Sequence, residues 1–186
     1  MEKDNTEATI RDVEGNEYRT VKIGMQVWMA ENLRVAHKPD GAPVKSYAPN
    51  DDPNNVKAYG YLYDWETACR VCPPDWHLPS EAEWATLESY LGNSAAGKLK
   101  DIGYWKSPNT GATNETGLSA RPAGYYNDQG FENNFGLRCI FWCSTRRDTH
   151  FIWTRVLSYD HADLRRAHQH PQYGFSIRCV KDDLRQ

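Results

Sequence analysis

The sequence predicts an α+β fold in one domain, and three observations lead to this prediction. The segments with helical signals lie in the first half of the chain, between residues 59 and 92. From residue 103 onward, short strand-like runs alternate with turns rich in glycine, asparagine and proline. A chain of 186 residues, 39% hydrophobic and 25% charged, is long enough for one core and too apolar for disorder.

The N-terminal region predicts a leader, a hairpin and a long loop. Residues 1–10 are charged and lack an apolar period, so we expect a flexible leader before a single domain over 11–186. Residues 12–33 carry strand-forming side chains and predict a hairpin with its turn at Glu14–Asn16. The polar, proline-rich stretch 35–57 predicts a surface loop.

Two helices are expected next. The stretch YGYLYDWETACRVC, residues 59–72, indicates a short helix entered from an aromatic strand. The second helix has clearer signals, because Ser80 at the N-cap and Glu83 three residues later form a capping box, and Gly92 ends the helix. One apolar stripe follows from the spacing of Trp84, Leu87 and Leu91.

The second half of the chain predicts strands over four segments, which are 117–131, 139–145, 152–159 and 174–180. A polar stretch with three histidines and two adjacent arginines, but no apolar period, precedes the last of them. It could be a metal site, a nucleic-acid patch or a binding surface.

Metal and nucleic acid are the weaker interpretations of this stretch. His161, Asp163, His168 and His170 have suitable chemistry, but their spacing is not one that zinc sites use. The net charge of −3 argues against a nucleic-acid binder, which usually carries a basic excess. We therefore expect no metal, no cofactor and no nucleic-acid partner.

Six segments in order resemble the Fibrobacter succinogenes major paralogous domain across residues 11–182. They are DVEGNEYRTVKIGMQVWMAENL, YGYLYDWETA, CPPDWHLPSEAEW, GLSARPAGYYNDQGF, FWCST and GFSIRCVKD. The resemblance implies a C-type lectin-like fold, with two helices packed on a small twisted antiparallel sheet, long irregular loops and paired chain ends. It also implies secretion from Bacteroidetes-type bacteria, often as a surface lipoprotein.

The resemblance also bears on the cysteines and on catalysis. It implies a Cys72–Cys179 disulfide, although two reduced cysteines are the alternative, and the odd count of five leaves a free thiol. Cys69 and Cys72 form C-x-x-C, but the lectin-like context argues against a redox motif. Catalytic relatives of the fold oxidise a cysteine and carry an active cysteine pair beside an RGGSW-type motif. This chain lacks that motif, and Cys139 and Cys143 fall in a predicted core strand. Calcium-binding EPN, QPD and WND tripeptides are absent too, so no catalytic residue is assigned.

Residues 146–173 are the expected binding face, with Asn127 and Asp128 at its rim. Twelve asparagines occur in residues 1–134 and none in 135–186. Diversity-generating retroelements act on variable proteins of the C-type lectin fold by mutating adenines, preferentially in asparagine codons, which can yield most of the residues found here. An ordinary invariant loop is the alternative. The expected ligand-binding residues are Arg146, Arg147, Asp148, His150, Thr154, Arg155, Tyr159, Asp160, His161, Asp163, Arg165, Arg166, His168, His170, Gln172 and Tyr173.

These features together lead us to expect a non-catalytic surface protein of receptor or adhesin type. Its partner would be a protein or glycan on another cell or virion, and it would contact a membrane only through a lipid anchor outside this chain. No signal peptide or membrane span is visible, which taken literally indicates a cytoplasmic protein, and the alternative is a mature or truncated chain. We expect an extracellular or cell-surface location, and a bacterial cell surface and a phage virion are both open. The alternatives are a structural or adhesive module of fixed specificity and a cysteine oxidase related to the formylglycine-generating enzyme.

Overall fold

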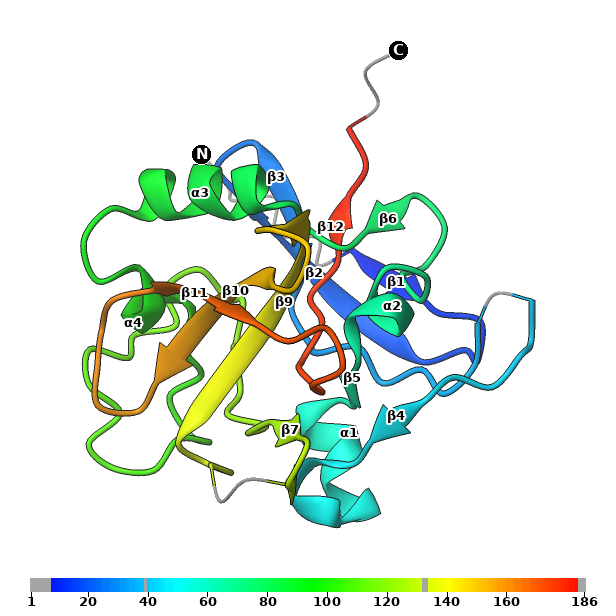
Figure 1. The fold of residues 1–186 in the computed structure, drawn as a ribbon. Helices are drawn as coiled ribbons and strands as arrows, with labels where there is room; N and C mark the ends of the chain where they lie inside the picture. Colours follow the sequence, from blue (N-terminus) through cyan, green and yellow to red (C-terminus); the bar gives the residue numbers. More distant parts are fainter. Residues whose placement is uncertain (1–7, 39, 132–133, 184–186) are drawn as a thin grey trace.

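The computed structural model describes residues 8–38, 40–131 and 134–183, and it is a mixed α and β fold in which strands predominate (Figure 1). The strands of the larger sheet, in spatial order, are β1 (Thr9–Arg11), β2 (Glu17–Ile23), β3 (Gln26–Met29), β12 (Val180–Lys181) and β6 (Trp76–His77). A second sheet has the order β11 (Arg165–Gln169), β10 (Ile152–Ser158), β9 (Arg138–Arg146). All of these ladders are antiparallel, in agreement with the predicted α+β class.

The N-terminal strands form two turns where one was predicted. The hairpin of β2 and β3 closes at Gly24, where the backbone has φ +61° and therefore favours glycine. The predicted turn at Glu14–Asn16 instead connects β1 to β2, and the Asp12 carboxylate accepts its backbone N–H groups at 2.9 and 3.0 Å. Thr9 and Ile10 of the expected leader belong to β1, and residues 1–7 lie outside the described residues.

Helix α3 (Glu81–Leu91) follows the prediction from its first residue to its last. The Ser80 hydroxyl accepts the N–H of Glu83 at 3.2 Å, and the Glu83 carboxylate accepts the N–H of Ser80 at 2.8 Å, which completes the capping box. The predicted stripe of Trp84, Leu87 and Leu91 is buried.

The other helices are short, and only one of them lies where a helix was expected. That one is α2 (Trp65–Ala68), which begins after the N-cap Asp64 and covers four residues. The unpredicted ones are α1 (Val56–Tyr59) and α4 (Ala95–Leu99). The loop over 35–57 also contains β4 (Ser46–Tyr47), which pairs with β5 (Leu62–Tyr63), and the 3-10 turns η1 (Pro49–Asp51) and η2 (Pro53–Asn55).

Strand β9 divides the interior into two hydrophobic clusters. Cys139, Phe141 and Cys143 face the cluster under α3 and α4, whereas Ile140 and Trp142 face the cluster beneath α2 and β6. Alternate residues of a strand point to opposite faces, so a strand covered on both sides is apolar at every position. This accounts for the uninterrupted run CIFWC, and Figure 1 shows β9 crossing the middle of the fold with α3 beyond one end.

The two C-terminal segments exchange the roles that the sequence predicts for them. Residues 174–180 are buried throughout, but they pair mainly through single bridges, such as Tyr63 with Phe175 and Phe141 with Ser176, and form a ladder only at β12. The polar stretch before them, expected to be irregular, contains β11, which pairs with β10 over five residues. It is an edge strand with an exposed side, so its sequence needs little apolar character.

A disulfide joins Cys72 to Cys179 across a sequence separation of 107 residues, as the family resemblance implied. It ties the segment between α2 and β6 to the residue before β12. Among the described residues the free cysteines are Cys69, which is exposed, and the buried Cys139 and Cys143. None of the described helices has the length and hydrophobicity that a membrane span requires.

Candidate functional site

The predicted binding residues separate into four groups in the structure. The first group lines a cleft and consists of Arg146, His170, Gln172 and Tyr173. The second is exposed on the β9–β10 turn and on β11, and consists of Arg147, Asp148, His150, Arg165, Arg166 and His168. The third lies in the β10–β11 connection at the opposite end of the sheet, and consists of Tyr159, Asp160, His161 and Asp163. The fourth, Thr154 and Arg155, is buried.

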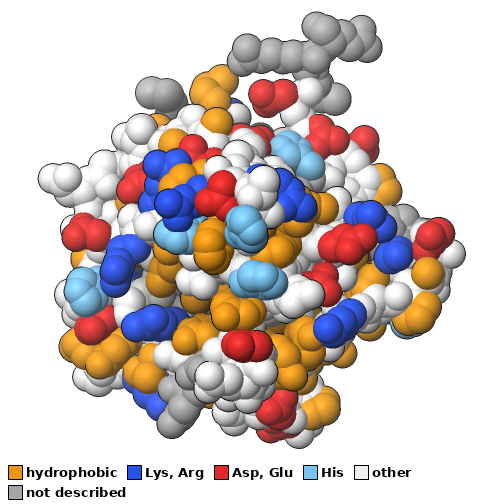
Figure 2. All heavy atoms as spheres, in the orientation of Figure 1, with side chains coloured by type: hydrophobic (Ala, Val, Ile, Leu, Met, Phe, Trp, Pro, Cys, Tyr) orange, Lys and Arg blue, Asp and Glu red, His pale blue; other side chains and the backbone are white. Residues whose placement is uncertain are grey.

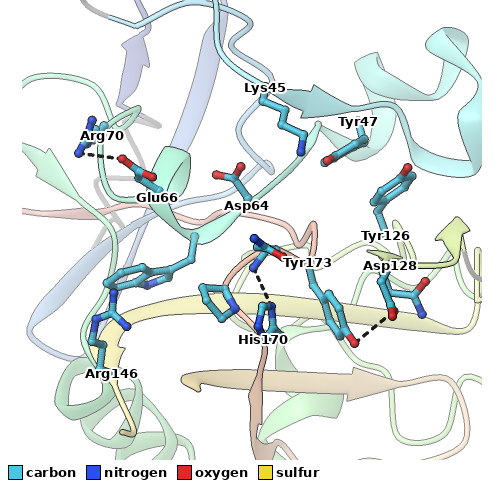
Figure 3. Close-up of a pocket in the computed structure, with 14 residues that line it drawn as sticks. Lys45, Tyr47, Asp64, Glu66, Arg70, Tyr126, Asp128, Arg146, His170 and Tyr173 are labelled. Atoms are coloured by element: carbon cyan, nitrogen blue, oxygen red, sulfur yellow. Dashed lines mark hydrogen bonds and ion pairs between the residues drawn. The ribbon is translucent and has the colours of Figure 1, made fainter. Parts of the chain in front are cut away.

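The cleft has a volume of about 980 Å³ and is built from five separate parts of the chain (Figure 3). One of them is the turn of β7 (Tyr126–Asn127) and β8 (Gly130–Phe131), which brings Asn127 and Asp128, the expected rim residues, to the cleft. The residues that line it are Lys45, Tyr47, Asp64, Trp65, Glu66, Arg70, Tyr126, Asn127, Asp128, Arg146, His170, Pro171, Gln172 and Tyr173.

A pair of stacked tyrosines forms one end of the cleft. The rings of Tyr47 and Tyr126 lie 3.9 Å apart between centroids at an interplanar angle of 13°, and the Lys45 ammonium lies 5.4 Å above Tyr47. Gly174 passes beneath this pair, where a Cβ atom would come within 3.1 Å of both tyrosine side chains. A larger residue at position 174 would therefore press on the stack.

The turn at 170–173 forms the floor of the cleft. The Tyr173 hydroxyl donates to Asp128 at 3.3 Å, and the backbone N–H of Gln172 lies 3.4 Å from His170 Nδ1 (Figure 3). Burial and the neighbouring Asp128 carboxylate raise the pKa of Tyr173, so its phenol stays protonated at neutral pH and remains a donor. Trp65 donates its backbone N–H to the Pro171 carbonyl at 2.9 Å, which attaches the turn to α2.

Trp65 and Arg146 form the other end. The indole Nε1–H of Trp65 donates to the carbonyl of Cys143 at 2.9 Å, so the ring is fixed against β9. The guanidinium carbon of Arg146, the last residue of β9, lies 4.4 Å from the centre of that ring. In the same end of the cleft, Glu66 pairs with Arg70 at 3.0 Å.

A second aromatic and basic cluster lies on the exposed edge of the three-stranded sheet. Arg166 lies 3.7 Å and Arg147 5.7 Å from the ring centre of Trp153, and Arg147 also hydrogen-bonds His168. Arg166 pairs with Glu81 of α3 at 2.9 Å. Figure 2 shows basic and histidine side chains interspersed with hydrophobic ones over this part of the surface.

The structure corrects the expectation that Thr154 and Arg155 contact a ligand. Both lie in β10, which is the central strand of its sheet, and their exposed fractions are 0% and 1%. Arg155 donates to Glu81 at 3.0 Å and lies 3.7 Å from Glu88, so it fastens the sheet to α3. From the sequence these positions look like their neighbours, and only the strand pairing places them inside.

The third group is too far along the sheet to join the cleft. Here Lys100, which is buried, donates to the carbonyls of Thr110, Ser158 and His161 at 2.8 to 3.1 Å and holds the connection in place. Because His161 precedes β11, whereas His168 and His170 lie at its far end, His161 sits at the opposite end of β11 from both. Within the described part of the chain, no three His, Cys, Asp or Glu side chains are grouped so that they could hold a metal ion.

The two buried cysteines have the chemistry of packed thiols. Burial raises the pKa of Cys139 and of Cys143 to about 12. Thiols with such pKa values are protonated at neutral pH, whereas cysteine oxidation and metal binding need the thiolate.

Apart from the rim residues Asn127 and Asp128, sequence reasoning missed the part of the cleft that lies outside the C-terminal segment. Lys45 and Tyr47 fall in a loop that was assigned no role, while Asp64 and Trp65 were interpreted as helix residues. The density of aromatic residues in YGYLYDW and AGYYND was the available signal, but it does not distinguish core rings from surface rings.

Comparison with known families gives one match. The sequence pattern of the Fibrobacter succinogenes major domain matches residues 21–181, which is most of the chain, so the protein belongs to this family. Comparisons with curated proteins and with solved structures gave no significant match.

Proposed function

We propose that this member of the Fibrobacter succinogenes major domain family is a non-catalytic binding protein that holds a partner in the cleft. One observation carries the proposal. Arg146, His170, Gln172 and Tyr173, which the sequence marks as surface residues without a folding role, line the same cleft as the Tyr47–Tyr126 stack. Tyrosine and arginine side chains on a fixed scaffold are efficient anchors for a partner.

We also propose a C-type lectin-like fold and a location at a cell or virion surface. The fold is supported by the helix α3 beside an antiparallel sheet, by the insertion of β12 between β3 and β6, and by the Cys72–Cys179 bridge. The location is supported by that bridge alone, because disulfides persist mainly in oxidising compartments. The raised thiol pKa values of Cys139 and Cys143 argue against the alternative of a cysteine oxidase.

Filling the cleft should abolish binding without unfolding the protein. Gln172 is exposed and lines the cleft, so Gln172→Trp adds a large ring where a partner would lie. We expect at least about a tenfold loss of affinity, the size of effect typical at an interface centre, for probes that the wild type selects from random peptides and from a glycan array. Surface plasmon resonance measures the affinities.

Ser89→Trp is the matched control, because it adds the same ring at an exposed position of α3, outside the cleft. It should bind like the wild type. Equal binding by Gln172→Trp and wild type would show that the cleft does not hold the partner.

We further propose that the exposed positions of 146–173 are diversified in the natural population. The proposal is supported by the absence of asparagine from residues 135–186 and by the exposure of most of the predicted binding residues in the segment. The amino acids at buried positions of the same segment should vary little. A replacement for Arg155 would leave Glu88 without its cation, and a replacement for Thr154 would disturb the core.

Deep sequencing of the 3′ end of this gene across its source population tests the diversification. We expect substitutions at the codons of exposed residues such as Asp148, His150 and Gln172, near-constant codons for Arg155, and a reverse transcriptase gene nearby. A uniform 3′ end without such a gene would exclude diversification and leave a binding cleft of fixed specificity.

A further inference from the structure

The geometry of Arg146 indicates what kind of group the cleft is built to hold. The side chain lies over the Trp65 ring, which is itself fixed by hydrogen bonds from its indole N–H to Cys143 and from its backbone N–H to Pro171. An arginine that stacks on a ring exposes the edge of its guanidinium, and that edge carries the N–H donors. Arg146 is therefore held with its donors available at one end of the cleft (Figure 3).

The carboxylates nearby are already engaged. Glu66 pairs with Arg70, Asp64 accepts the N–H of Thr67 at 2.9 Å as the cap of α2, and Asp128 accepts the Tyr173 hydroxyl. Within the described residues, no carboxylate lies within 4.0 Å of the Arg146 guanidinium. The cleft thus contains a positioned cation whose natural acceptor is not supplied by the described chain.

A second cation lies at the opposite end of the cleft. Lys45 is exposed and extends over Tyr47, and Figure 3 shows its ammonium directed into the space between the tyrosine end and Asp64. Outside the cleft, Arg147 follows Arg146 directly and Arg165 is exposed on β11. The lining of the cleft itself balances Lys45, Arg70 and Arg146 with three carboxylates, Asp64, Glu66 and Asp128. Because Arg70 is paired with Glu66, the positive charge open to a ligand is that of Arg146 and Lys45.

We infer that the cleft binds an acidic peptide segment, with a carboxylate of that segment paired to Arg146. The inference rests on the proposed binding function and specifies the chemistry of its ligand. Arginine and carboxylate form paired, parallel hydrogen bonds, which give both affinity and orientation. A peptide with a second acidic residue reaches Lys45 across the floor formed by His170 and Tyr173.

An acidic sugar offers the same carboxylate, but the rings of the cleft favour a peptide. Sugars stack their C–H faces on open aromatic faces. Here Tyr47 and Tyr126 cover one another, Lys45 lies over Tyr47, and Arg146 covers a face of Trp65. These contacts leave fewer open ring faces for a sugar, whereas ring edges and hydroxyl groups suit the backbone and side chains of a peptide.

Selection from a phage-displayed library of short random peptides on the wild-type protein tests the inference. We expect the selected peptides to be rich in Asp and Glu, and synthetic copies to bind Arg146→Gln about tenfold more weakly or worse, as for loss of a charged hydrogen-bonded pair. Replacing glutamate with glutamine in these peptides should weaken their binding to the wild type by the same factor. The affinity of the original peptides should fall as salt is added. Arg138→Gln is the control, because Arg138 is exposed at the other end of β9, about 26 Å away at strand spacing.

The outcomes separate this inference from the proposed function. The selected peptides could bind Arg146→Gln normally but fail to bind Gln172→Trp. That result would overturn the inference of an acidic ligand and leave the cleft as a binding site. Peptides that neither variant rejects would overturn both. The selection could also yield no peptide while polygalacturonate binds in a way that depends on Arg146. That result would show that the carboxylate belongs to a sugar and would overturn the inference of a peptide ligand.

Discussion

Replacing Arg178 with methionine is expected to lower the free energy of unfolding by about 3–5 kcal/mol, the range for removing one partner of a buried charged network. Arg178 has an exposed fraction of 1% and donates to Asn32 and to the carbonyls of Met29, Leu118 and Ser119. Methionine fills similar space but donates no hydrogen bond, so these buried acceptors would lose their donors. Urea unfolding followed by tryptophan fluorescence measures the change.

Arg178→Lys should recover only part of the loss, because a single ammonium cannot reach groups that are arranged around a planar guanidinium. Arg165→Met is the matched control. Arg165 lies exposed on the edge strand β11, and its replacement should change stability by less than about 0.5 kcal/mol, as for ordinary surface sites. Comparable losses in Arg178→Met and Arg165→Met would show that the buried hydrogen bonds of Arg178 do not stabilise the fold.

Removing the disulfide is expected to have an effect of similar size. The bridge closes a loop of 107 residues in the unfolded chain, and the loss of that restraint costs about 3–5 kcal/mol by chain entropy. The double variant Cys72→Ala/Cys179→Ala should therefore unfold at a clearly lower urea concentration than the oxidised wild type. Reduction of the wild type should produce the same shift and raise its mass by two hydrogens.

Cys69→Ala provides the comparison, because Cys69 is exposed and outside the bridge. It should unfold like the wild type. If the double variant also did so, or if the mass of the wild type were unchanged by reduction, the bridge would contribute nothing in solution. The support that it provides for a surface location would then be lost.

Local signals in the sequence determined the elements whose residues interact with near neighbours in the chain. Helix α3 is the clearest case, since its cap, its apolar stripe and its terminal Gly92 all lie within thirteen residues of one another. The double-sided burial of β9 is also visible, because both faces of that strand must be apolar. The Cys72–Cys179 pair came from the resemblance to the family, since no local spacing specifies it.

Elements that depend on distant partners were not visible in the same way. β11 forms because its backbone lies beside β10 and pairs with it. An edge strand with an exposed face carries almost no hydrophobic period, so its sequence does not reveal it. The same pairing places Thr154 and Arg155 inside, although their side chains resemble those of a surface loop. Arg178 occupies a strand-like apolar run, and only its distant carbonyl acceptors explain why a charge is buried there.

The sequence by itself determined the α+β class, the helix α3 and the family, and it predicted a binding face in the C-terminal segment. The tertiary structure decided which of those residues share a site. Arg146, His170, Gln172 and Tyr173 lie in the cleft because β9 ends where the 170–173 turn meets α2, and Lys45 and Tyr47 join them from a loop a hundred residues earlier. Hydrophobic periodicity reports burial along one element, whereas a cleft is formed where several elements end, so no single stretch of sequence encodes it.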